Sequence, residues 1–226
     1  MFLGHFAVGF ASKRLAPRTS LGSLLAAACF PDLLWPLLLL AGLEQVRIDP
    51  GNTAFTPLDF VSYPFSHSLL LVCVWAALLG AGYQAATHYR RGAVVLAMGV
   101  VSHWALDAAT HRPDMPLVPW GGPRLGLGLW NSIPATLAVE SAMFLAAVML
   151  YQSGTRARDA IGKWGYASFL SVIVAIYLAS LAGPPPPSVP ALAWVALGLS
   201  LFLLWAAWFD RHREPVVAAS GETNTR

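Results

Sequence analysis

The stretch GVVSHWALDAATHRPD, residues 99–114, ends a long apolar run and carries three polar side chains at steps of four, His103, Asp107 and His111. Four residues make about one turn of an α-helix, so these side chains share one helix face. The apolar run 92–111 is about long enough to cross a bilayer. A polar stripe inside hydrocarbon is costly unless something satisfies it, which makes this face the first candidate functional site.

The composition predicts an integral membrane protein. Hydrophobic residues make up 57% of the chain and charged residues 11%, against about 25% charged in soluble domains. No basic tract with interleaved aromatic residues is present, so a nucleic-acid partner is not expected. Cys29 and Cys73 lie in apolar segments and are interpreted as core residues, not as a disulfide.

Apolar segments of about 20 residues predict the membrane spans. Six are found, at 21–43, 67–88, 92–111, 130–152, 164–183 and 191–209. The predicted fold is an all-α, polytopic transmembrane helix bundle of about six spans plus a short buried N-terminal half-helix at 1–12. We expect 1–213 to form a single transmembrane domain and 214–226 a disordered cytoplasmic tail.

The basic residues predict the orientation. Eleven of the fourteen lysines and arginines lie in alternate loops or at the C-terminus: Lys13, Arg14, Arg18, Arg90, Arg91, Arg156, Arg158, Lys163, Arg211, Arg213 and Arg226. The positive-inside rule places this set, and the C-terminus, in the cytoplasm. Loops 44–66 and 112–129 then face outside, with Tyr63, Trp120 and Trp130 at the level of the lipid headgroups.

Few ionisable residues lie inside the predicted hydrophobic segments, and they define the candidate site. They are His5, Asp32, His67, His103, Asp107 and Glu140. A carboxylate at the centre of a span costs roughly 3 kcal/mol, and no lysine or arginine lies mid-span to pair with these acids. Imidazole nitrogens with carboxylate oxygens suit zinc best, with manganese and iron as alternatives.

Each residue also has a structural interpretation. His5 and His67 could be interfacial or helix-capping histidines, and Glu140 could hydrogen-bond the segment 131–136. His111 precedes the Arg-Pro pair where the helix must stop, so it is either a further ligand or a C-cap. His103 and Asp107, spaced i, i+4, are typical of helical metal motifs, and they favour a shared site for the set.

Two prolines surround Asp32. Pro36 has no N–H for the Asp32 carbonyl, so a kink is expected between Asp32 and Pro36, with Pro31 just ahead. We expect the site to open between the outer helix ends, under loops 44–66 and 112–129.

Several short motifs resemble a known family. GHFAVGF, FPDLLWP, SHSLL and SHWALDAATHRPDMPLVP occur, within roughly residues 1–120, in the order seen in bacterial predicted membrane-bound metal-dependent hydrolases. That family looks like a membrane-embedded relative of zinc-dependent phospholipase C. Ahead of the second span this chain departs from the family pattern and reads SYPFSHS.

The resemblance implies a ligand set and a location. One ion would be held by Asp32, His67, His103 and Asp107, and a second by His5, Asp107 and the N-terminal amine. His111 and Glu140 are the residues that could add further ligands. The implied cofactor is one or two zinc ions, or another divalent metal, in a protein of the bacterial inner membrane.

The favoured hypothesis is a metal-dependent hydrolase that acts on a lipid or lipid-linked phosphoester or acyl bond near the outer leaflet. Asp32 would be a ligand or the catalytic base. Arg112 or Arg124 could bind a phosphate, or could be solvated loop residues. The alternatives are a proton- or cation-coupled transporter that uses the same cluster, and a cluster that only ties helices together.

Overall fold

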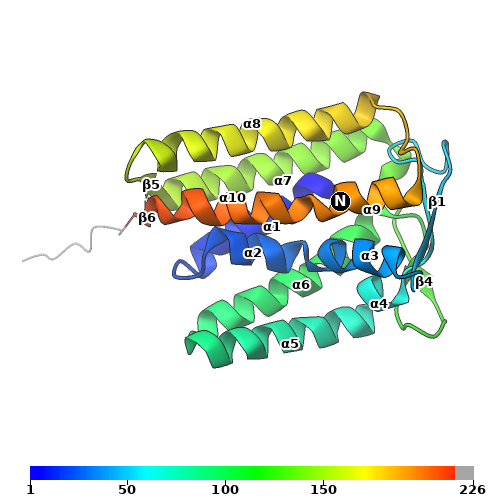
Figure 1. The fold of residues 1–226 in the computed structure, drawn as a ribbon, viewed down its shortest axis with the longest axis horizontal. Helices are drawn as coiled ribbons and strands as arrows, with labels where there is room; N and C mark the ends of the chain where they lie inside the picture. Colours follow the sequence, from blue (N-terminus) through cyan, green and yellow to red (C-terminus); the bar gives the residue numbers. More distant parts are fainter. Residues whose placement is uncertain (217–226) are drawn as a thin grey trace, which may run out of the picture.

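Long apolar helices run side by side along the molecule (Figure 1). A computed structural model describes residues 1–216. Five stretches are long and apolar enough to cross a membrane: α5 (Leu69–Thr87), α6 (Arg90–Thr110), α7 (Ile133–Gly154), α8 (Ala160–Ala182) and the pair α9 (Val189–Leu197) and α10 (Leu199–Arg211). The bent pair α2 (Leu21–Ala28) and α3 (Phe30–Leu40) supplies a sixth. The predicted helical bundle is therefore confirmed.

The N-terminal helix α1 (Phe2–Leu15) lies inside the bundle. Its 14 residues correspond to about 21 Å, shorter than the roughly 30 Å of a hydrocarbon core. It packs against α2, α6 and α7. Its residues Phe6 and Phe10 are almost wholly buried in a hydrophobic core of the protein. This is the buried half-helix expected from the sequence, extended to Leu15.

The first span is broken, but not where it was expected. The two halves meet at an angle of 59° at Cys29, whereas Pro36 lies inside the continuous helix α3. The break falls ahead of Pro31 because this residue has no N–H to continue the helix, while a proline is favourable in the first turn of a new one. The expected kink between Asp32 and Pro36 was therefore wrong, and Asp32 instead lies in the first turn of α3.

Short hairpins close both ends of the bundle and were not predicted. At one end lie β1 (Gln45–Ile48), β2 (Leu58–Ser62), α4 (Pro64–His67), β3 (Met115–Pro116), β4 (Arg124–Leu125) and the 3-10 turn η1 (Leu129–Asn131). At the other end β5 (Thr155–Ala157) pairs with β6 (Arg213–Pro215). The expected tail 214–226 begins within β6, and 217–226 lie outside the described residues.

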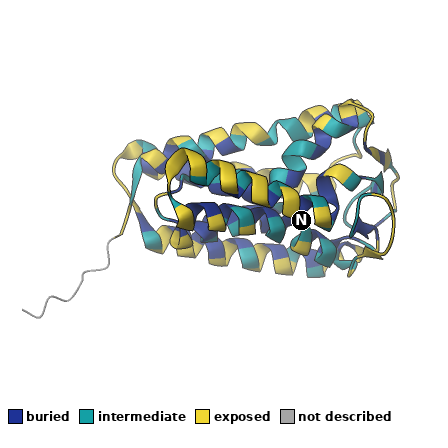
Figure 2. Cartoon of the chain, turned by 90° about the horizontal axis from the view of Figure 1, so that it is seen from below, coloured by how far each residue is buried: buried dark blue, intermediate teal, exposed yellow. Residues whose placement is uncertain are grey.

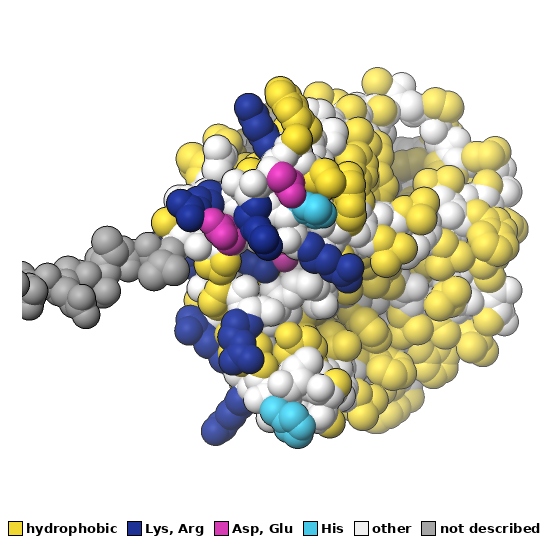
Figure 3. All heavy atoms as spheres, turned by 60° about the vertical axis from the view of Figure 1, so that its left-hand side comes forward, with side chains coloured by type: hydrophobic (Ala, Val, Ile, Leu, Met, Phe, Trp, Pro, Cys, Tyr) yellow, Lys and Arg dark blue, Asp and Glu magenta, His cyan; other side chains and the backbone are white. Residues whose placement is uncertain are grey.

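Exposed residues follow the helices along their length (Figure 2), and many of them are large and apolar. Met98, Leu201 and Leu204 are each more than 60% exposed, which suits contact with lipid. Lysine and arginine gather at the β5–β6 end (Figure 3). Arg14 lies beside Gly154, and Arg18 stacks over Tyr89, so loops distant in sequence meet at this end. The fold is that of a multi-pass membrane protein; its orientation stays a prediction.

Candidate metal centre

Five predicted site residues from four elements meet in one cluster inside the bundle. His5 comes from α1, Asp32 from α3, His67 from α4, and His103 and Asp107 from α6. Two triads each have potential ligand atoms within 4.8 Å of one another, and both include His103. The first triad adds His5 and Asp107, and the second adds Asp32 and His67. These buried groups could hold a metal ion.

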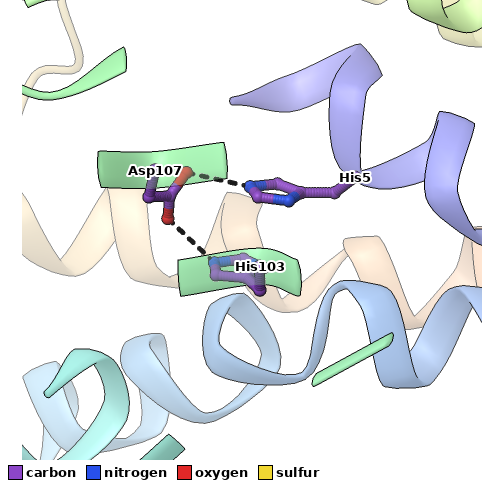
Figure 4. Close-up of side chains that lie close together, drawn as sticks. All are labelled: His5, His103 and Asp107. Carbon is purple, nitrogen blue, oxygen red and sulfur yellow. Dashed lines mark hydrogen bonds and ion pairs between the residues drawn. The ribbon is translucent and has the colours of Figure 1, made fainter. Parts of the chain in front are cut away.

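Asp107 lies at the centre of the cluster. Its Oδ1 is 3.0 Å from His5 Nε2 and its Oδ2 is 3.0 Å from His103 Nε2 (Figure 4). The same Oδ2 is 3.7 Å from His67 Nε2. The terminal amine of Met1 also donates to Asp107 Oδ1 at 2.6 Å. One carboxylate therefore faces three imidazoles, an arrangement that suits a bridging ligand.

Asp32 completes the cluster on its open side. Its Oδ1 is 3.6 Å from His67 Nε2 and 3.7 Å from His103 Nε2. The Asp32 side chain is 38% exposed, whereas those of His67, His103 and Asp107 are at most 4% exposed. Access to the cluster is therefore on the side of Asp32.

A backbone carbonyl fixes the orientation of the His103 ring. The break after α2 leaves the Ala28 oxygen free, and it lies 2.8 Å from His103 Nδ1. A carbonyl only accepts, so Nδ1 must carry the hydrogen, and in a neutral ring Nε2 then presents its lone pair. That atom makes no hydrogen bond to the described residues, although Asp107 Oδ2 is 3.0 Å away. Two facing acceptors repel each other, and a proton or a metal ion between them relieves the conflict.

A chain of hydrogen bonds orients His67 in the same way. Ser66 Oγ donates to Glu44 Oε2 at 2.6 Å, so it accepts from His67 Nδ1, also at 2.6 Å. Glu44 Oε1 accepts the backbone N–H groups of Phe65 and Ser66. His67 Nε2 then faces Asp32 and Asp107. Such outer partners are usual for metal-binding histidines.

The two further candidates lie outside both triads. Glu140 Oε2 accepts from Leu3 N at 2.6 Å and Gly4 N at 3.3 Å, so it caps the start of α1. The expected alternative bond to segment 131–136 is not made by Glu140. His111 ends α6, with its backbone N–H bonded to the Asp107 carbonyl, which is the C-cap interpretation.

The His111 ring belongs to the loops. Its Nδ1 lies 3.0 Å from Asp114 Oδ1, and the ring contacts Trp130 and Phe60 at centroid distances of 4.3 and 4.7 Å. Burial lowers the pKa of this imidazole. Tyr63 donates to the same Asp114 oxygen, and burial raises the pKa of its hydroxyl.

The expected opening under the loops is closed. Tyr63 and Trp130, expected at headgroup level, are buried, and of the three expected aromatic residues only Trp120 is exposed. Arg112 bonds Asp59, Asp114 and Asn52 and is therefore already paired, which argues against a phosphate role. A cavity of about 50 Å³, lined in part by Arg124, lies beneath these loops, but none of the five cluster residues lines it.

Sequence reasoning missed the outer partners of the cluster. Ser66 is adjacent to His67, which is a signal that could have been used. No such signal marks Glu44, because it is an isolated acid in a predicted loop and lies 22 residues from Ser66, which it contacts. The Ala28 carbonyl could not be found from side-chain patterns at all.

Comparisons with protein-family models, with curated proteins and with solved structures find no match for this chain. The resemblance to membrane-bound hydrolases therefore rests on the short motifs alone. What the protein does has to be inferred from its fold and from the grouping of its side chains.

Proposed function

We propose that this protein is a membrane-embedded, metal-dependent hydrolase, with zinc as the metal and a lipid or lipid-linked phosphoester or acyl compound as the substrate. The observation that carries the proposal is the orientation of His103. A backbone carbonyl holds its Nδ1–H, so that its Nε2 faces two carboxylates in a buried site. Imidazole and carboxylate ligands with an accessible side are typical of catalytic zinc sites.

The five cluster residues would hold one or two ions. When bound, such an ion supplies Lewis-acid polarisation and an acidified water near neutral pH. Asp32 is the accessible carboxylate, so it can act as a ligand or take a proton from the attacking water. The Glu44–Ser66 chain and the Ala28 carbonyl hold His67 and His103 in place.

One observation favours hydrolysis over proton or cation transport. Phe6 and Phe10 follow His5 along α1 and are almost wholly buried. Their aromatic rings therefore occupy the space between the cluster and the β5–β6 end. The next acid at that end, Asp210, is paired with Lys13 at 2.6 Å and with Tyr151 at 2.8 Å. A transport path needs a continuous series of polar groups.

The proposal also places the site towards the outer leaflet of a bacterial inner membrane, with the β5–β6 end in the cytoplasm. Its support is the positive-inside rule, applied to the basic residues at that end (Figure 3).

The test is hydrolysis by the purified protein in mixed micelles. We expect the protein to cleave at least one member of a panel of phospholipids and lipid-linked phosphates. A chelator should abolish this activity, and added zinc should restore it. Asp32→Asn should abolish turnover because an amide cannot accept the proton. Gradient-driven flux in vesicles, without hydrolysis of any panel member, would instead establish the transporter.

A further inference from the structure

The accessible side of the cluster opens into an apolar groove between helices. A cavity of about 420 Å³ is bounded by α1, α3, α8 and the α9–α10 junction, and this volume falls in the range of small-molecule pockets. Its walls are mainly apolar: they include Phe2, Trp35, Ile176, Val195, Leu199 and Phe202. Asp32 is the one ionisable side chain among the described residues that line it.

The groove lies at the depth of the membrane. Ile176 is well inside α8, and Leu199 is near the middle of the α9–α10 span. Val195, on the wall, is 78% exposed. The mouth of the groove therefore faces hydrocarbon and not water.

The loop side offers no comparable route. The aromatic stack of Phe60, His111 and Trp130 and the ion pairs of Asp59 and Asp114 cover that end of the site. A molecule that reaches Asp32 without moving these loops must come sideways from the bilayer.

Trp35 forms part of the groove wall and is 6% exposed. The groove thus combines an apolar wall with a carboxylate that belongs to the cluster.

We propose that this groove binds one hydrocarbon chain of an amphiphilic substrate, which enters from the bilayer and brings its polar group to Asp32. The inference rests on the proposed function, because it names the substrate class and the approach to the same site. It predicts that the chemistry acts on compounds carrying a long alkyl chain.

Two substitutions on one helix form a matched test. Leu201 lines the groove and is 66% exposed, whereas Leu204 does not line it and is 68% exposed. Both side chains face lipid, so Leu201→Trp and Leu204→Trp should both fold. Only the first fills the groove.

The probe is a phospholipid with a photoactivatable diazirine in one acyl chain, incorporated into phosphatidylcholine nanodiscs with the full-length protein. We expect cross-links on α3 at the buried Trp35, reduced about tenfold by Leu201→Trp and unchanged by Leu204→Trp. Equal labelling of α3 in the two variants, or labelling confined to the lipid-facing side chains, would overturn the proposal.

A kinetic comparison separates this proposal from the proposed function. Leu201→Trp should lower kcat/KM for a long-chain phospholipid but not for a water-soluble nitrophenyl phosphodiester. Equal loss with both substrates argues against the groove while leaving the hydrolase in place. If the parent protein cleaves no member of the lipid panel, the hydrolase fails, and the cross-linking result still decides whether the groove binds a chain.

Discussion

At the scale of single residues, the cluster is governed by the protonation of its histidines. His103 and His67 each give their Nδ1–H to a fixed oxygen outside the cluster. Their Nε2 atoms therefore face carboxylates, and a bound cation between them would explain how so polar a group persists without lysine or arginine partners. If the cluster holds a metal ion, each outer partner would contribute to its affinity by orienting a ligand.

Removing the Ser66 hydroxyl should weaken metal binding without removing a ligand. Ser66→Ala takes away the acceptor of His67 Nδ1, and we expect zinc affinity to fall about 10- to 100-fold. Competition with a chelator, followed by metal analysis, measures the change. Ser68→Ala is the control, since the Ser68 hydroxyl is buried and finds no hydrogen-bond partner within residues 1–216. Equal effects in both variants would contradict the positioning role.

Asp107→Asn should reduce both bound zinc and thermal stability. The amide cannot serve as an anionic bridge between His5 and His103, so metal content should drop about tenfold or more. Asp159→Asn is the control, because Asp159 caps α8 at the opposite end of the bundle. Metal content equal to that of the parent protein would leave the cluster with a structural role only.

At the scale of elements, two irregular helices build the site. The break at Cys29 releases the Ala28 carbonyl for His103 and brings Asp32 to the first turn of α3. The short helix α1 begins inside the bundle, and its first backbone N–H groups need an acceptor there. Glu140 supplies it.

Glu140→Ala should destabilise the protein without removing metal. Loss of the buried acceptor leaves the N–H groups of Leu3 and Gly4 unsatisfied, at a cost of about 1–3 kcal/mol. Glu140→Gln keeps a carbonyl acceptor and should lose less. Thermal unfolding in detergent and metal analysis measure the two effects, and a fall in zinc in Glu140→Gln at unchanged stability would make Glu140 a ligand.

At the scale of the whole molecule, charge is segregated between the two ends. Lysine and arginine gather at the β5–β6 end, while Arg47 and Arg112 at the loop end share ion pairs with Asp59. This asymmetry predicts the orientation in the membrane. The α6 members of the cluster, His103 and Asp107, lie in the second half of that helix, nearer the loop end.

Cysteine labelling tests that orientation. Leu127 is 85% exposed in the loop 112–129, and Arg158 is exposed between α7 and α8. In a Cys73→Ser background, Leu127→Cys should react with an impermeant maleimide from outside intact cells, and Arg158→Cys only after lysis. The reverse pattern would invert the topology.

The sequence alone determined the fold class and the residues that meet. Apolar runs of about 20 residues can satisfy their backbone in lipid only as helices, so the spans of the bundle were predictable from composition and length. The high cost of ionisable groups in hydrocarbon singled out His5, Asp32, His67, His103 and Asp107, because each needs a partner there.

Only the tertiary structure decided how these groups are arranged. The position of the break depended on which of two prolines, Pro31 or Pro36, begins a new helix. The local sequence does not distinguish between them. The roles of Glu44, Glu140 and the Ala28 carbonyl depend on contacts across 22, 137 and 75 residues. The direction of access was also a tertiary property, since the groove over Asp32 exists only where α9 and α10 pass α3. Hydrogen-bond partners and cavities depend on which helix faces pack together. The periodic pattern of a sequence shows whether a helix face is apolar or polar, but not which other face it contacts.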